Sequence, residues 1–177
     1  HCYWCVRGDH AICTELIGLF TATFADGSTR LSRHGETVYR GLNVGAFAET
    51  VITQEAGAIK IDEDVPLDVA CVVGCAVQTG VGAVLNTAKV PEGATVLVVG
   101  LGGVGLSVVQ GARLAAASRV IAVDPLAERR ETALRLGATD VIDPTDTDVT
   151  AATLDLTAVG ADYAFEAAGK GMLAATC

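Results

Sequence analysis

The hydrophobic pattern of the chain changes near its middle. From residue 95 onward, short apolar runs alternate with segments that are apolar at helical spacing, and Gly137 follows one such segment where helices often end. Strands separated by helices of this length predict a parallel sheet with crossover helices, an α/β fold. The predicted strands are 95–99, 119–123, 141–142 and 163–167, and the predicted helices are 104–116, 126–136 and a weak helix in the polar stretch after residue 142.

The residues before about Ile61 have the pattern of turns and short strands instead. The segments 25–28 and 33–35 are turn signals, and the run 45–53 alternates apolar and polar residues as a strand does. This part is therefore predicted to be β-rich, with a domain boundary near residues 62–68. We divide the chain accordingly into two domains, residues 1–66 and residues 67–177.

Two uncharged stretches, 69–88 and 93–112, are each twenty residues long and could be mistaken for a membrane hairpin. The second contains six glycines with a turn in its middle, and the first contains Gln78, Thr79 and Asn86. Buried strands and packed helices of α/β proteins have the same uncharged character. We therefore predict no membrane segment here.

Composition and charge limit the classes of partner. The chain has 177 residues, 51% apolar and 19% charged, which is enough for the core of one domain and a short neighbour. Its net charge of −9 would repel nucleic-acid backbones and anionic membranes, so we predict neither as a partner. The cysteine-rich, polar-interrupted start is unlike a signal peptide and predicts a cytoplasmic protein. The ends at His1 and Cys177 lead us to expect an internal piece of a longer chain.

A glycine-rich motif lies between a predicted strand and a predicted helix. Gly100, Gly102 and Gly105 form a G-x-G-x-x-G pattern, and Asp124 comes at the end of the next strand, 19 residues beyond Gly105. Such glycines permit a tight turn, let a pyrophosphate approach the backbone and allow close packing of helix on sheet. A carboxylate at that strand end can accept hydrogen bonds from ribose hydroxyls. The alternative is a glycine turn of an unrelated α/β fold with Asp124 as a solvated cap.

Three cysteines near the start have the spacing of metal ligands. Cys2, Cys5 and Cys13 supply three thiolates within twelve residues, whereas a structural zinc site requires four ligands. The fourth is either His10 or a residue just before His1. The alternative is a group of free, buried thiols.

Two more cysteines precede the nucleotide-binding half. Cys75 lies in the segment 74–80, and Cys71 lies four residues earlier. Buried lone cysteines are common, so each of them, taken alone, is predicted to be a packed core thiol more often than a ligand.

Together these residues resemble the zinc-containing medium-chain alcohol dehydrogenases, particularly the glutathione-dependent formaldehyde dehydrogenase branch. The zinc lobe of that family reads C-x2-C-x2-C-x7-C, and Cys2, Cys5 and Cys13 match its last three positions. Its first cysteine would lie two residues before His1. The resemblance therefore favours a preceding cysteine over His10 as the fourth ligand.

The resemblance also implies roles for residues of the second half. In the family, a G-C-x-x-x-T-G segment carries a cysteine ligand of the catalytic zinc and a threonine near the nicotinamide, which would be Cys75 and Thr79. Asp124 and Arg129 fall where the family binds the adenosine ribose. The run 100–105 matches the coenzyme loop, which implies contacts from Gly100, Leu101, Gly102, Gly103, Val104 and Gly105, with Val104 beside the nicotinamide.

The implied architecture is a partial Rossmann sheet preceded by the end of a GroES-like catalytic domain. The other ligands of the catalytic zinc and the proton relay would lie before position 1, and the last two Rossmann strands after position 177. We therefore expect residues 1–177 to be inactive alone. The resemblance implies a homodimer or homotetramer for the complete protein.

The leading hypothesis is a zinc- and NAD-dependent oxidoreductase that transfers hydride between a primary or secondary alcohol, or an aldehyde, and NAD. Asp124 favours NAD over NADP, although Arg129 or Arg130 could swing toward a 2′-phosphate and offset part of the repulsion. A second hypothesis is a formaldehyde dehydrogenase that acts on a thiol adduct such as S-hydroxymethylglutathione. It would need an anion-binding patch, and the candidates are Arg30, Arg33 and Arg40, although scattered arginines usually form a solvated face.

A third hypothesis belongs to another class, a redox-sensing or nucleotide-binding protein without turnover. Cys75 argues against it, because such a protein does not need a thiolate ligand for a catalytic zinc.

Overall fold

The structure is a computed structural model that describes residues 2–14, 21–24, 26–41, 45–53, 55 and 58–170. It divides into two compact units, residues 1–60 and residues 61–177, which we describe separately. This division falls a few residues before the boundary predicted from the sequence. The assignment of the first part to a GroES-like domain stays a prediction.

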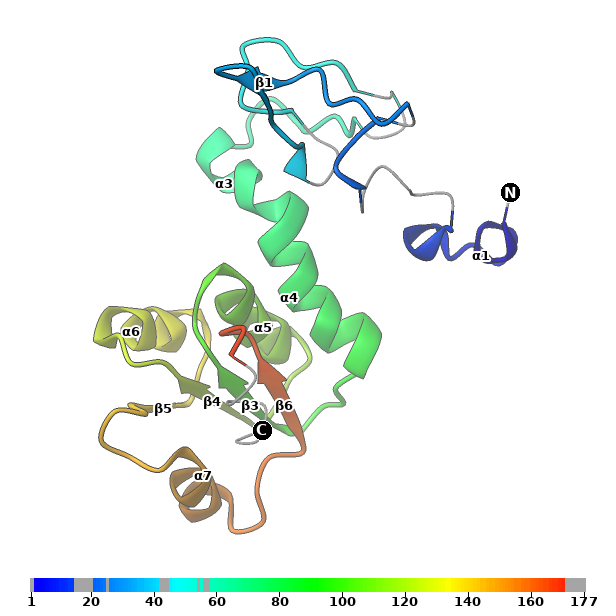
Figure 1. The fold of residues 1–177 in the computed structure, drawn as a ribbon. Coiled ribbons are helices and arrows are strands. Elements are labelled where there is room, and N and C mark those ends of the chain that lie inside the picture. The colour runs from blue at the N-terminus through cyan, green and yellow to red at the C-terminus, as the bar shows by residue number, and fades with distance from the viewer. Residues whose placement is uncertain are drawn as a thin grey trace. The chain divides into compact units, whose positions relative to one another are not determined.

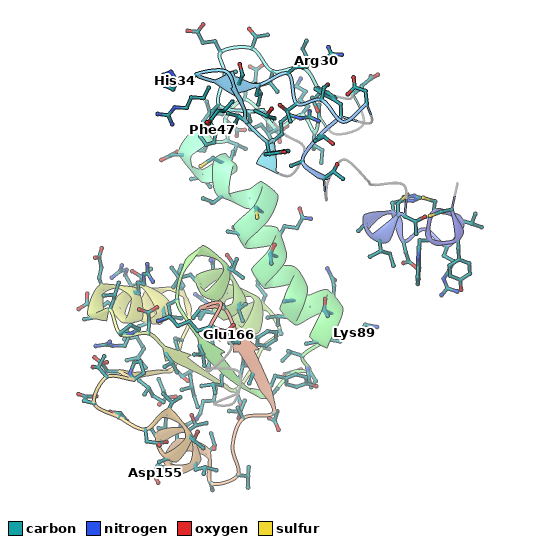
Figure 2. The ribbon with its side chains drawn as sticks, viewed as in Figure 1. Arg30, His34, Phe47, Lys89, Asp155 and Glu166 are labelled. Carbon is teal, nitrogen blue, oxygen red and sulfur yellow. The ribbon has the colours of Figure 1, made fainter. Side chains whose placement is uncertain are left out.

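The first unit has little regular structure among its described residues. Its elements are α1 (Tyr3–Val6), a 3-10 helix η1 (His10–Ile12) and a hairpin of β1 (Ser32–Arg33) and β2 (Glu36–Thr37). The hairpin confirms the turn signal at 33–35, since His34 and Gly35 both have positive φ. Arg30, His34 and Phe47 of this unit are labelled in Figure 2.

The strand predicted over residues 45–53 is wrong. No strand forms there, Phe47 is fully exposed, and Ile52 is 97% exposed. An alternating sequence forms a strand only when a neighbour takes up its backbone hydrogen bonds. Within the described part of residues 1–60, the two strands of the hairpin pair only with each other. The prediction that this part is β-rich is thus borne out only for the hairpin.

The second unit contains the predicted parallel sheet. Its strand order is β5-β4-β3-β6, and each neighbouring pair is parallel. The first strand of the sheet, β3, therefore lies in its interior. The next two strands, β4 and β5, follow toward one edge, and β6 lies on the other side of β3. This Rossmann-like arrangement confirms the predicted α/β class. The strands are β3 (Thr95–Val99), β4 (Arg119–Val123), β5 (Asp140–Ile142) and β6 (Tyr163–Glu166).

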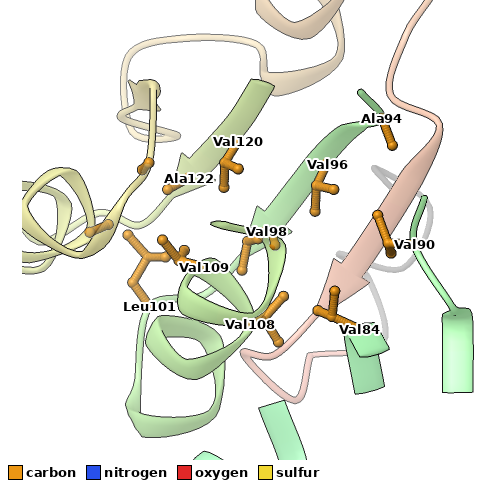
Figure 3. Packing of buried hydrophobic residues seen from close by; sticks show 13 residues of the cluster. Val84, Val90, Ala94, Val96, Val98, Leu101, Val108, Val109, Val120 and Ala122 are labelled. Carbon is orange, nitrogen blue, oxygen red and sulfur yellow. The ribbon is translucent and has the colours of Figure 1, made fainter. Parts of the chain in front are cut away.

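Helices cover both faces of the sheet (Figure 1). They are α5 (Gly103–Leu114), α6 (Ala127–Leu136) and α7 (Val149–Thr157), each near its predicted place. Val96 and Val98 pack with residues of α5 and α6 in one core cluster (Figure 3), whereas Leu97 and Val99 pack with Val149 in the other. Burial of both faces explains why these strands are apolar without alternation.

A long helix precedes the sheet. It comprises α3 (Leu67–Val72), a π-helical segment η4 (Val73–Val77), α4 (Gln78–Gly82) and a second π-helical segment η5 (Ala83–Ala88). It packs closely on α5, because a Cβ atom added at Gly80 would lie 2.5 Å from the Cβ of Ser107. At Gly111 on α5, an added Cβ would lie 3.1 Å from the Cα of Val81. These glycines set the distance between the two helices.

The two uncharged stretches differ in the structure. The stretch 93–112 forms β3, a loop and the first part of α5, so it contributes to the core, as predicted. Among the described residues, the helix Leu67–Ala88 is long and apolar enough to cross a membrane by length and composition alone. Buried core helices of soluble proteins pass the same test, but only 11% of the apolar window of this helix is buried. Val84 of this helix is fully buried in the sheet core, whereas Leu67 at its start is 78% exposed.

Candidate functional site

The glycine loop after β3 is closely packed at its first and third glycines and open at its second. Gly100 has φ +92°, and an added Cβ would lie 2.6 Å from the backbone nitrogen of Ala168. A Cβ at Gly105 would collide with the carbonyl oxygen of Gly100. At Gly102, by contrast, an added Cβ would meet nothing within 4 Å. The loop thus fits the close approach of a pyrophosphate at its second glycine.

The loop leads directly into α5. Gly102 is the N-cap residue of this helix and provides no side-chain cap. The first N–H groups of a helix have no partner within it, and together with the helix dipole they favour an anion. The helix therefore begins at the open position of the loop, where a phosphate group would lie.

Asp124 follows β4 and ties the loop to that strand. Its side chain is only 4% exposed. Oδ2 accepts a hydrogen bond from the N–H of Leu101 at 2.9 Å, and Oδ1 accepts one from the N–H of Leu126 at 2.9 Å. The sequence predicted a ribose-binding carboxylate here, but it gave no sign that this carboxylate also holds the glycine loop.

The two arginines after Asp124 have different environments. The side chain of Arg129 is half exposed, and its Nη1 lies 3.5 Å from Asp124 Oδ2. Arg130 is only 17% exposed. Its Nη1 donates to the carbonyl oxygen of Asp124 at 2.6 Å, and its Nη2 lies 2.8 Å from Asp143 Oδ2. Arg129 can therefore move toward a ligand, whereas Arg130 is held.

A cavity of about 280 Å³ lies at the carboxyl ends of the strands, as expected for a ligand site in an open α/β sheet. Its charged lining residues are Asp124, Arg129 and Lys170. Lys170 and Pro144, which also lines it, were not singled out by sequence reasoning, because no spacing links them to the glycine motif.

The turn after β6 forms one wall of this cavity and is organised by Glu166, labelled in Figure 2. Its Oε1 accepts a hydrogen bond from the N–H of Ala168 at 2.8 Å, and its Oε2 accepts one from Gly169 at 3.2 Å. The carboxylate thus fixes the backbone that crowds Gly100.

Cys75 and Thr79 lie on the long helix beside the start of α5. Cys75 is in the π-helical segment η4, a type of distortion that is frequent at functional sites. A Cβ at Gly103 would lie 3.2 Å from the Cβ of Ala76, and one at Gly80 would lie 2.5 Å from the carbonyl oxygen of Val104. The helix segment that carries Cys75 and Thr79 is thus adjacent to the glycine loop.

The expectation of packed core thiols is wrong for both cysteines of this helix. Cys71 and Cys75 are exposed, and Cys71 Sγ donates to the carbonyl oxygen of Asp68 at 3.2 Å. The reason is that the helix packs on α5 through Ala76, Gly80 and Val84, and the cysteines lie on other faces.

The three N-terminal cysteines converge. Cys2 is the N-cap of α1, Cys5 lies within α1, and Cys13 follows η1. Cys2 Sγ lies 3.7 Å from Cys5 Sγ and 3.8 Å from Cys13 Sγ. A tetrahedron with zinc–sulfur bonds of about 2.3 Å has edges of about 3.8 Å, so the sulfurs fit three corners of a zinc site.

The thiols of this cluster differ in acidity. Backbone N–H groups of Cys5 and Thr14 lower the pKa of Cys2 to about 6. Hydrogen bonds with the thiols of Cys13 and Cys2 raise the pKa of Cys5. A metal ion would have to displace the protons that these sulfurs share.

Within the described part of the chain, Cys2, Cys5 and Cys13 are the only group of three or more metal-ligand side chains. His10, the alternative fourth ligand, is not a member of it. Cys75 also has no such group around it among these residues, so this chain offers one thiol at that position.

Two of the three candidate anion-binding arginines share an aromatic neighbour. The guanidinium carbon of Arg40 lies 3.6 Å from the ring centroid of Phe24, and that of Arg30 lies 5.1 Å from it. Arg33 is exposed on β1. Arg30 and Arg40 are therefore gathered at one place, which the sequence did not indicate.

The glycine loop, the strand-end carboxylate and the cavity form a site of the kind that binds dinucleotides in α/β proteins. Comparisons with known proteins are more specific. Residues 103–177 match the family described as zinc-binding dehydrogenase. Alcohol dehydrogenase 6 of Peromyscus maniculatus is 39% identical over 171 residues, 96% of this chain and 46% of the relative. S-(hydroxymethyl)glutathione dehydrogenase of Escherichia coli O1:K1 / APEC is 41% identical over 176 residues, 96% of this chain and 47% of the relative.

Solved structures agree. An alcohol dehydrogenase zinc-binding domain protein from Burkholderia ambifaria has a TM-score of 0.87 at 37% identity, over 99% of this chain and 48% of its own. Benzyl alcohol dehydrogenase from Acinetobacter calcoaceticus has a TM-score of 0.86 at 32% identity, with the same coverage. Over nearly its whole length the chain is therefore similar to members of the zinc-binding medium-chain alcohol dehydrogenase family, and residues 103–177 match the family model. It spans about half the length of the curated relatives that it matches.

Proposed function

We propose that this chain serves in a zinc-dependent oxidoreductase that transfers hydride between an alcohol or aldehyde and NAD. The observation that carries the proposal is the close packing of the helix segment that carries Cys75 and Thr79 on Gly103 and Val104 of the glycine loop. An exposed thiol suited to bind zinc would then lie near the nicotinamide end of a bound dinucleotide. When bound, zinc would supply a Lewis acid for the alcohol oxygen and NAD would supply the hydride acceptor.

The residues of the second unit would hold the coenzyme. The open position at Gly102 and the start of α5 would receive the pyrophosphate, and Asp124 and Arg129 would bind the adenosine ribose. Thr79 and Val104 would position the nicotinamide ring. The contacts of these residues with coenzyme are inferred from the loop geometry and from the family.

NAD is the proposed coenzyme because of the charge of Asp124. A 2′-phosphate would lie at hydrogen-bonding distance from this carboxylate. Two like charges about 4 Å apart repel by on the order of 4 kcal/mol at an effective dielectric of 20. Arg129 would bond the ribose and so support the binding of NAD, and we do not expect it to rescue NADP.

Two metal roles follow. Cys75 would be one thiolate ligand of the catalytic zinc, and Cys2, Cys5 and Cys13 would hold three corners of a structural zinc. The second site supports folding and takes no part in the reaction. We also propose a cytoplasmic homodimer or homotetramer, acting on a small alcohol or aldehyde.

A second candidate function is the oxidation of a formaldehyde–thiol adduct. The relatives named S-(hydroxymethyl)glutathione dehydrogenase support it, and so does the pairing of Arg30 and Arg40 around Phe24, which would suit the carboxylates of such an adduct. A non-catalytic nucleotide sensor is disfavoured, because it would have no use for a zinc-ligand cysteine beside the coenzyme loop.

The test uses the full-length gene product that contains this chain. Zinc content, NADH binding and reduction of NAD are measured with primary and secondary alcohols and with formaldehyde, with and without glutathione. Oxidation of simple alcohols without a thiol supports the first proposal. Turnover of formaldehyde only with glutathione supports the second. Coenzyme binding without any turnover would refute both.

A further inference from the structure

The cavity lining and the arginine behind it point to a specificity residue outside the glycine motif. Arg130 lies next to the proposed ribose site, because its guanidinium bonds the carbonyl oxygen of Asp124 at 2.6 Å. It does not line the cavity, whereas its neighbour Arg129 does. The position of the Arg130 side chain therefore also depends on what binds the other terminal nitrogen of its guanidinium, Nη2.

The Nη2 atom of Arg130 is bound by Asp143, which follows the carboxyl end of β5. Asp143 Oδ2 lies 2.8 Å from Arg130 Nη2. Its Oδ1 accepts hydrogen bonds from the hydroxyl of Thr145 at 2.6 Å and from the N–H of Thr145 at 3.0 Å. These bonds from Thr145, and then the nearby Arg130, lower the pKa of Asp143, so it stays ionised near neutral pH. The ion pair is thus oriented at both ends.

We propose that Asp143 is a specificity-determining residue that holds Arg130 away from the 2′-position of the adenosine ribose. The inference rests on the proposed function, since it assumes that Asp124 faces the ribose. Asp124 and Arg129 form one pair of opposite charges and Asp143 and Arg130 form another, so these four side chains sum to zero, and Lys170 adds one positive charge to the cavity lining. Loss of the Asp143 charge raises the net positive charge beside the site and leaves the Arg130 guanidinium held only by the carbonyl oxygen of Asp124, which is the condition that accommodates a 2′-phosphate.

The direction of the effect separates this role from a structural one. Asp143→Asn and Arg130→Ala both break the same ion pair, and any general loosening of the strand ends should be similar in the two variants. Only Asp143→Asn releases Arg130, so that a second arginine besides Arg129 can reach the phosphate. Asparagine also keeps an acceptor for Thr145, so the turn after β5 is retained.

The experiment measures dissociation constants for NADH and NADPH by fluorescence titration of the full-length gene product. We expect Asp143→Asn to tighten NADPH binding by about tenfold and to change NADH binding by less than about twofold. Arg130→Ala should give no gain for NADPH, and the double variant should lose the gain. The matched control is Asp140→Asn, which removes the same charge from β5 where Asp140 pairs with Arg119 at 3.6 Å. It should leave the ratio of the dissociation constants for NADH and NADPH unchanged within about twofold.

Several outcomes would overturn the inference. These are an unchanged ratio in Asp143→Asn, equal weakening of both coenzymes, the same gain in Asp140→Asn, or a gain that persists without Arg130. If the unaltered protein binds no NADH, the proposed nucleotide site itself is refuted, and this inference with it.

Discussion

The two units of the chain are stabilised in different ways. In the described residues, every buried hydrophobic side chain lies between Val84 and Val149, in the second unit. In the described part of the first unit, the only buried residue is Thr29. The first unit has instead a cluster of three thiols with the separations of a zinc site. One unit is held by an apolar core, and the other depends on local contacts that a metal ion would complete.

The two units differ in whether the residues that stabilise the fold also shape the candidate coenzyme site. In the second unit, the close packing that stabilises the sheet also shapes the coenzyme loop, since Gly100 and Gly105 are crowded by backbone. In the first unit, a metal ion bound by the thiol cluster would stabilise the fold and would take no part in the reaction. Substitutions should therefore have separable effects on stability and on turnover, and the expectations below test this separation.

The largest effect is expected for Cys75. Cys75→Ala in the full-length gene product should reduce turnover by about a thousandfold or more, because it removes a proposed ligand of the catalytic metal. Binding of NADH should be nearly unchanged, since the side chain contributes no nucleotide contact in our proposal. Steady-state rates and NADH titration give the two readouts.

Cys71→Ala is the matched control. This cysteine lies four residues away on the same helix and is also exposed, so its loss should be mild. Equal losses of turnover from both substitutions would mean that the ligand has been assigned to the wrong residue.

The next largest effect concerns the first unit. Cys5→Ser should lose about one zinc per chain and lower the unfolding midpoint by roughly 10 °C, since binding of a structural zinc contributes folding free energy. Metal content by mass spectrometry and a thermal melt measure both. His10→Ala should retain the zinc, because His10 is not part of the thiol cluster. An unchanged zinc content in Cys5→Ser would refute the site.

Much of the second unit could be predicted because runs of apolar residues in its sequence coincide with the buried strands. The strands at 95–99 and 119–123 are confirmed residue for residue, since both faces of the sheet are covered and each run is apolar after its first residue. The glycine loop also follows from the sequence, because only glycine tolerates the positive φ of Gly100 and the crowding at Gly105.

The features that could not be predicted depend on partners distant in sequence. The run 45–53 alternates correctly, yet it forms no strand without a paired neighbour among the described residues. The bond from Leu101 to Asp124 spans 23 residues and depends on the placement of two loops. The retention of Arg130 by Asp143 likewise requires the order of β4 and β5 in the sheet, which the sequence pattern does not specify.

A smaller effect should distinguish the apolar core of the second unit from the exposed apolar residues of the first unit. Val98→Ala removes two methyl groups from a fully buried position and should cost about 2–3 kcal/mol of unfolding free energy. Ile52→Ala in the first unit, where the side chain is 97% exposed, should change it by less than about 0.5 kcal/mol. Chemical denaturation of the two variants measures the difference. Similar losses would show that Ile52 is covered in the full-length protein.

The smallest effect concerns coenzyme choice and is expected to affect binding more than folding. Asp124→Ser shortens the side chain, so it removes both the charge beside the ribose and the acceptor for the N–H of Leu101. We expect the NAD:NADP ratio of kcat/KM to fall by about tenfold or more. Asp124→Asn separates the two causes, because it removes the charge but keeps an acceptor within reach of the loop. If the charge of Asp124 dominates, both variants should lower the NAD:NADP ratio of kcat/KM equally. Only Asp124→Ser should also weaken NADH binding, because it loosens the glycine loop. A wild-type enzyme that already uses NADP as well as NAD would show that Arg129 outweighs the carboxylate.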